Sequence, residues 1–145
     1  MKNVIVFSVA SARWAIELRW VREVITLGHT TPVPHAPPAF AGVVNFGGAI
    51  VPVLELMPLI DPQYAANESA APRASAVLLQ VESVRAALRV DTVVEVTTLR
   101  HVGADRWADA QGLEARLVDP AELVARARAD VSDAPALRRA EDPIQ

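Results

Sequence analysis

Two stretches of the chain carry the same short pattern, and this internal repeat constrains the fold more than any other feature. Residues 9–24, VASARWAIELRWVREV, align with residues 81–96, VESVRAALRVDTVVEV, with seven identical residues among sixteen. Glu23 then corresponds to Glu95, and Val21 to Val93. Such self-similarity indicates two copies of one strand–turn–strand unit, each too small for a large core, which bury their apolar faces together.

The residues in and around each copy predict β-strands. Residues 4–9 are a short apolar run rich in β-branched residues, and apolar residues then alternate with charged ones up to Arg19. The second copy and the residues on either side of it contain three further candidate strands, at residues 77–81, 86–90 and 93–99. The chain is therefore predicted to be mainly β.

The segment that follows the first copy predicts a loop and a hairpin. Residues 31–40, TPVPHAPPAF, contain four prolines, which remove amide donors and fix φ, so an ordered turn or loop is expected there. Residues 42–56, GVVNFGGAIVPVLEL, predict two strands joined by a tight turn at Gly47 and Gly48. Pro52 is tolerated in such a strand only at an edge or a bulge.

Two segments resemble a signal peptide and a membrane-spanning helix, but their residues argue against both. The N-terminal MKNVIVFSVASA is shorter than a secretory signal peptide, and the repeat uses Val9 and Ser11 as part of a fold element. Residues 36–54 carry no charge, yet their prolines and glycines would break a lipid-exposed helix repeatedly. We expect a soluble, cytoplasmic protein without direct membrane insertion.

Composition excludes several classes of function. Lys and Arg total 14 against 17 Asp and Glu, and the basic residues are scattered, so no surface for nucleic acid is predicted. The chain has no Cys, which excludes disulfides, thiolate nucleophiles and Cys-based metal sites. At 145 residues the chain has the size of one domain that can bury a real core.

No constellation of residues predicts catalysis. The three histidines, at positions 29, 35 and 101, lack the spacing of a metal site, and we expect neither a metal nor a cofactor. No G-x-S-x-G motif or phosphate-binding loop is present. A carboxylate pair such as Glu23 and Asp91 leaves a small β-barrel enzyme as one alternative. The repetition of Glu23 as Glu95 favours a structural or docking role instead.

The C-terminal part contains one clear helix signal. Asp119 is a candidate N-cap, Pro120 suits the first helical position, and Glu122 lies in the first turn. Leu123 and Val124 then supply an apolar face. From about residue 129 apolar periodicity ends, and residues 131–145 are expected to be a flexible tail.

The order of these segments resembles the CheW-like coupling proteins of bacterial chemosensory arrays. The residues that carry the resemblance are VREV at 21–24, the long segment at 32–56, LRVDTVVEV at 88–96 and LVDPAELV at 117–124. The resemblance implies an all-β fold of two small, packed, SH3-like β-barrel subdomains with a short C-terminal helix. It implies one CheW-like domain over residues 1–130, whose halves are about 1–60 with the C-terminal helix and about 75–115, joined by a surface connection.

The resemblance also implies a function. CheW-like proteins are non-catalytic adaptors that link the cytoplasmic tips of chemoreceptors to a CheA-type histidine kinase, whose regulatory domain has the same fold. The family pattern Asn-Leu-Arg-Gly is replaced here by Asn45-Phe46-Gly47-Gly48, so the arginine associated with receptor coupling is missing. A divergent module that has lost or changed receptor coupling and binds another signalling partner is therefore the alternative.

Nine residues follow from the resemblance as candidate protein-binding residues: Val21, Glu23, Val24, Phe40, Gly42, Asn45, Gly47, Val93 and Glu95. Each has an alternative structural role. Gly42 suits a turn, Val21 and Val93 suit a core or a groove, and aromatic residues such as Phe40 serve equally in burial or as interface anchors. Glu23, a charged residue beside an apolar strand, is the strongest candidate.

Overall fold

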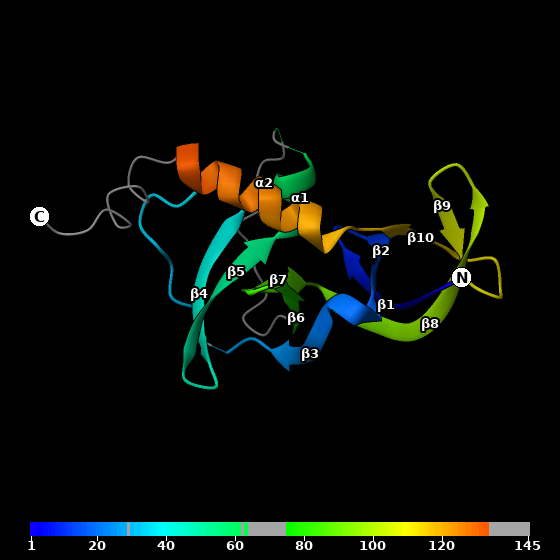
Figure 1. Ribbon diagram of the computed structural model, residues 1–145, viewed down its shortest axis with the longest axis horizontal. Coiled ribbons are helices and arrows are strands. Elements are labelled where there is room, and N and C mark those ends of the chain that lie inside the picture. Colours follow the sequence, from blue (N-terminus) through cyan, green and yellow to red (C-terminus); the bar gives the residue numbers. More distant parts are fainter. Residues whose placement is uncertain (29, 62, 64–74, 134–145) are drawn as a thin grey trace, which may run out of the picture.

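Two five-stranded sheets and two helices make up the described part of the chain (Figure 1). The computed structural model describes residues 1–28, 30–61, 63 and 75–133. In chain order the elements are β1 (Lys2–Val9), β2 (Ala12–Glu17), the 3₁₀ turn η1 (Leu18–Trp20), β3 (Val21–Thr26), β4 (Phe40–Phe46), β5 (Ala49–Glu55), α1 (Leu56–Ile60), β6 (Ser75–Val81), β7 (Val84–Val90), β8 (Thr92–Gly103), β9 (Arg106–Ala108), β10 (Glu114–Leu117) and α2 (Pro120–Asp133). The predicted mainly β fold with a C-terminal helix is confirmed.

Each sheet combines strands from both halves of the sequence. The first sheet is a closed barrel in the order β1-β2-β10-β9-β8, and the second has the order β3-β6-β7-β5-β4. The hairpin β1–β2 is thus completed by strands from the second half, and the hairpin β6–β7 by strands from the first. The predicted halves, 1–60 and 75–115, describe units along the sequence, whereas the sheets exchange strands between those units.

The two copies of the repeat have the same strand register. β3 pairs antiparallel with β6 and shifts register between Val21 and Glu23, so Arg22 has no partner there. β8 pairs antiparallel with β1 and shifts at the equivalent place, so Val94 has no partner there. Each copy therefore has a β-bulge at the middle residue of its Val-x-Glu triplet. The sequence repeat is a structural repeat.

The core explains why the hairpin strands are apolar on both faces. In β1, Ile5 and Phe7 enter a central cluster that also contains Val77 and Leu79 of β6. The other faces of the hairpins line their own sheets, with Val4, Val6 and Ala15 in the barrel and Ala76, Leu78 and Ala87 in the second sheet. The two hairpins thus pack against each other, and each buried large side chain contributes roughly 1.5–3 kcal/mol.

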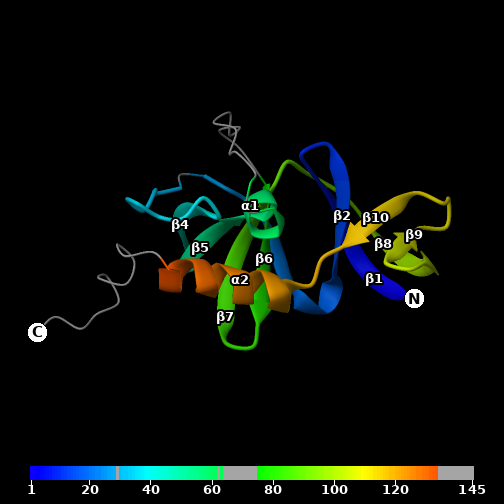
Figure 2. The ribbon, with the colours of Figure 1, turned by 90° about the horizontal axis from the view of Figure 1, so that it is seen from above.

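Both helices lie on one side of the molecule (Figure 2). The Asp119 carboxylate accepts a hydrogen bond from the Ala121 N–H at 3.0 Å, which confirms the predicted cap, and Pro120 is the first helical residue. α2 continues to Asp133, into the segment expected to be a tail. The helix thus includes the first three residues, 131–133, of the predicted tail.

The predicted β4–β5 hairpin is confirmed, with Gly47 at φ 59° and Gly48 at φ 84° in its turn. Pro52 lies opposite Val43, whose N–H and C=O both bond to Thr31 instead. β5 lies between β7 and β4, so Pro52 is at neither the edge nor the bulge that was expected. The parallel pairing with β7 begins only at Val53, so the missing N–H of Pro52 leaves no hydrogen bond between strands unmade.

Some sequence predictions fall outside the described residues: His29, most of the 61–75 connection, and the tail beyond residue 133. In the parts that are described, no helix has both the length and the apolarity to cross a bilayer. The uncharged residues 36–54 form a loop and most of a hairpin.

Candidate functional site

Two equivalent strand segments have one free backbone edge. β3 is the last strand of its sheet and pairs only with β6. β8 pairs with β1 along residues 92–99, and its pairing with β9 begins at Arg100. Free N–H and C=O groups along an exposed strand can pair with another chain. Both segments lie on the lower side of Figure 1 and contain five of the nine predicted site residues.

The bulge in each segment separates the valine and glutamate side chains of the repeated Val-x-Glu triplet. Residues two apart in a regular strand face the same way. Here Val21 lies opposite Leu79 of the central core, whereas Glu23 lies opposite Leu78 on the other face of the sheet. The extra residue, Arg22, causes this reversal. The motif thus anchors a half-buried valine in the core and presents an exposed glutamate on the opposite face of the sheet.

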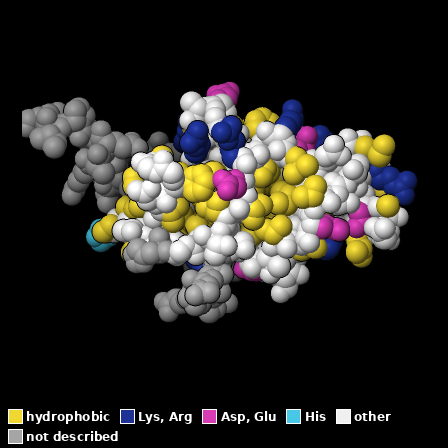
Figure 3. All heavy atoms as spheres, turned by 90° about the horizontal axis from the view of Figure 1, so that it is seen from below, with side chains coloured by type: hydrophobic (Ala, Val, Ile, Leu, Met, Phe, Trp, Pro, Cys, Tyr) yellow, Lys and Arg dark blue, Asp and Glu magenta, His cyan; other side chains and the backbone are white. Residues whose placement is uncertain are grey.

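Apolar side chains are exposed along both free edges. Val24 on β3 is 42% exposed, and Val94 and Val96 on β8 are 45% and 63% exposed. Figure 3 views the molecule from below, the side on which β3 and β8 lie in Figure 1, and shows hydrophobic side chains gathered over the middle of that face with acidic ones beside them. Contiguous exposed apolar surface with a polar rim is typical of an interaction site.

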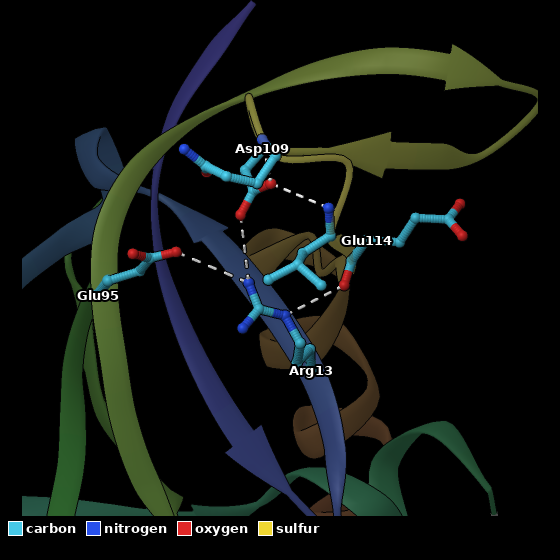
Figure 4. A network of polar contacts seen from close by, with 6 residues as sticks. Arg13, Glu95, Asp109 and Glu114 are labelled. Atoms are coloured by element: carbon cyan, nitrogen blue, oxygen red, sulfur yellow. Dashed lines mark hydrogen bonds and ion pairs between the residues drawn. The ribbon is translucent and has the colours of Figure 1, made fainter.

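The glutamates of the two copies have different surroundings, and Figure 4 shows those of Glu95. The Glu95 carboxylate lies 3.7 Å from a guanidinium nitrogen of Arg13, and the buried Asp109 carboxylate lies 3.8 Å from the same nitrogen. Arg85 is the repeat equivalent of Arg13. Within the described residues, neither Arg85 nor Glu23 has a side-chain hydrogen bond or ion pair. Arg13 and Asp109 were not among the predicted site residues, and the sequence alone does not indicate that they come together with Glu95.

Two predicted residues near the Pro-rich loop have structural contacts. Phe40 is half-buried against the central core. Gly42 has φ 146°, and a Cβ added there would lie 2.3 Å from the carbonyl oxygen of Thr31. Gly42 is therefore needed for the close approach of the loop to β4. These two residues thus help to position the segment, and their contact with a partner stays a prediction.

The two predicted residues of the hairpin turn differ from each other. The Asn45 side-chain oxygen accepts a hydrogen bond from the Gly48 N–H at 3.1 Å, so Asn45 shapes the turn. Gly47 is exposed, and a Cβ built there meets no atom within 4 Å. A longer side chain at position 47 would extend into open space.

A cavity of about 450 Å³ lies elsewhere, where β2 and β10 meet the two helices. Its wall includes Trp14, with the Arg116 guanidinium 5.1 Å from the ring centre, and Arg126, which donates to the Leu59 carbonyl at 2.8 Å. Neither Glu23 nor Asp91 lines it; the Asp91 carboxylate instead accepts the Ala10 N–H at 3.0 Å. In the described ranges, no group of three potential metal ligands occurs.

Comparison with known proteins agrees with this architecture. The model of the CheW-like domain family matches residues 3–110. The chemotaxis protein CheW of Rhizobium meliloti (strain 1021) is 30% identical over 98 residues, which cover 68% of this chain and 61% of that protein. The crystal structure of scaffolding protein TtCheW from Thermoanaerobacter tengcongensis has a TM-score of 0.57 and 26% identity, covering 66% of this chain and 63% of that one. The chain thus spans less than two thirds of each relative. It belongs to the CheW-like family.

Proposed function

We propose that this chain is a non-catalytic adaptor that couples chemoreceptors to a CheA-type histidine kinase in the cytoplasm. The observation that carries the proposal is the bulged Val-x-Glu triplet of a CheW-like domain, placed on a strand with a free edge. The names of the relatives, a chemotaxis protein and a scaffolding protein, support the same role.

The β3 edge offers three kinds of contact to a protein partner. Its unpaired backbone groups can accept an added strand, Val24 supplies exposed apolar area, and Glu23 supplies an unpaired negative charge. In our proposal the kinase regulatory domain binds through strand edges and apolar subdomain surfaces, and the receptor tip lies in an apolar groove. Neither contact requires bond chemistry, a metal or a cofactor.

Titration of the full chain with a kinase regulatory domain and with receptor tips encoded nearby tests the proposal. We expect binding to at least one partner, and no binding to either at tens of micromolar would overturn it. Glu23→Gln should weaken binding by about tenfold, as expected for loss of a charged contact. Glu82→Gln is the matched control, because Glu82 is an exposed glutamate in the β6–β7 turn and its substitution removes the same charge.

Gly47 favours a second candidate, a divergent CheW-like module with lost or altered receptor coupling. Its position is exposed and open, and the guanidinium of the family pattern is absent. Gly47→Arg would restore bidentate contacts. The control is Gly47→Ala, which imposes the same strain at φ 59° without the charge. Receptor affinity about fivefold or more higher for the arginine variant than for the alanine variant supports the divergent module; equal affinities contradict it.

A further inference from the structure

We infer that the ion pair between Arg13 and Glu95 makes the two equivalent Val-x-Glu bulges unequal, so that partners use the glutamate of β3. This inference rests on the proposed function, because it states which of two similar sites an adaptor of this kind uses.

Arg13 is held in place independently of Glu95. Its Nε donates to the Glu114 carbonyl oxygen at 3.3 Å, and its guanidinium lies 3.8 Å from the Asp109 carboxylate. Asp109 is itself only 2% exposed and accepts the N–H groups of Gln111 and Leu113, each at 2.9 Å. The guanidinium therefore stays at the mouth of the barrel whether or not Glu95 is bound by a partner.

The geometry brings this charge to Glu95. In the strand register, Arg13 of β2 lies opposite Ser8 of β1, and Glu95 of β8 lies opposite Val6 of β1. The ion pair therefore reaches across β1 from one neighbouring strand to the other. Figure 4 shows the guanidinium directed toward Glu95, Asp109 and the Glu114 carbonyl. One guanidinium thus faces two carboxylates. A cationic group of a partner that approached Glu95 would also meet the charge of Arg13.

The β3 copy has no such compensation. Arg85 is at the position equivalent to Arg13, and in the strand register of the β6–β7 hairpin it lies opposite Gln80. It is exposed and, as far as the structure describes the chain, forms no ion pair with Glu23. Asp109, just after β9, and Glu114, at the start of β10, hold Arg13 near the barrel mouth, and within the described residues no side chain holds Arg85 in the same way. Glu23 therefore keeps its charge available.

The test compares charge-removing variants of the full chain, titrated with the kinase regulatory domain and the receptor tip. Glu23→Gln should weaken binding about fivefold or more, and Glu95→Gln should change it less than about twofold. Arg13→Gln should strengthen binding about two- to fivefold, the range of an exposed ion pair, and adding Glu95→Gln should return it to the starting value. Equal losses from Glu23→Gln and Glu95→Gln would overturn the inference, as would an Arg13→Gln gain that persists in the double variant.

A measurement without any partner separates this inference from the proposed function. The side-chain carboxyl ¹³C resonance of Glu95 should move in Arg13→Gln, while that of Glu23 should not move in the matched variant Arg85→Gln. If the Glu95 resonance does not move, the inferred ion pair is wrong even when partners bind. If it moves but the unsubstituted chain binds neither partner, the proposed function fails and the docking half of the inference fails with it.

Discussion

The two sheets are built on one plan and differ in how they are closed. Both contain a repeated hairpin, a bulged partner strand and a strand that pairs in parallel with the hairpin. Hydrogen bonds close the first sheet into a barrel, whereas the second keeps β3 and β4 as its ends. The repeat thus determines the backbone register of both sheets. Residues outside the repeat, in the β9–β10 turn and the Pro-rich loop, determine how each sheet is closed or covered.

Different devices stabilise the two sheets. In the barrel, Asp109 organises the turn between β9 and β10 from within. In the second sheet, the Pro-rich loop runs along β4, where Thr31 and Val43 exchange two hydrogen bonds of 2.9 and 2.8 Å. Glu55 at the end of β5 also donates its N–H to the Ala39 carbonyl at 2.8 Å. The loop thus covers part of the β4 edge and leaves the β3 edge free.

Gly42→Ala should have the largest effect, because it separates the loop from the second sheet. The added Cβ would lie 2.3 Å from the Thr31 carbonyl oxygen, and φ 146° is unfavourable for alanine. We expect a loss of about 3 kcal/mol in the free energy of unfolding, measured by urea denaturation. Gly28→Ala is the control, because its Cβ meets open space. Similar losses in both variants would show that the loop contact does not stabilise this sheet.

Asp109→Ala should have a smaller effect, confined to the barrel. It removes a buried acceptor of two N–H groups and frees Arg13, for an expected loss of about 1.5–2 kcal/mol. Amide hydrogen exchange should accelerate at Gln111 and Leu113 and stay unchanged in the β4–β5 hairpin. Asp109→Asn keeps one side-chain oxygen and should lose less. Equal acceleration in both sheets would contradict the separate closure of the barrel.

The sequence was sufficient for the repeat and for the strands of the hairpins, but β9 and β10 were not predicted, and neither was the way the strands assemble. The apolar runs and the Gly47–Gly48 turn depend on local preferences, which the sequence states directly. The exchange of strands between halves depends on pairings of residues far apart, such as Glu95 with Val6, which no local pattern encodes. The same holds for the site. Glu23 was predicted, but its difference from Glu95 depends on Arg13 and Asp109, which meet only in the folded chain.

Two glutamates should give the sheets opposite pH dependence, and this is the smallest effect we expect. On the barrel side, the hydrogen bond from Lys2, at 2.9 Å, lowers the pKa of Glu17 below its ordinary 4.5. The stability from this pair is present above that value and is lost as pH falls through the folded-state pKa. On the other side, burial raises the pKa of Glu55 above 4.5, against the opposing charge of Arg89. Its contribution is present below that value and is lost as pH rises through the folded-state pKa.

Urea unfolding at a series of pH values from about 3 to 7 measures both contributions. Glu17→Gln should flatten the decline of stability on the acidic side, and Glu55→Gln should flatten the decline as pH rises above 4.5. Because Glu17 is in β2 and Glu55 at the end of β5, each variant reports on one sheet. If both variants changed the slope in the same direction, burial would not govern Glu55, and its ion pair with Arg89, at 3.2 Å, would dominate instead.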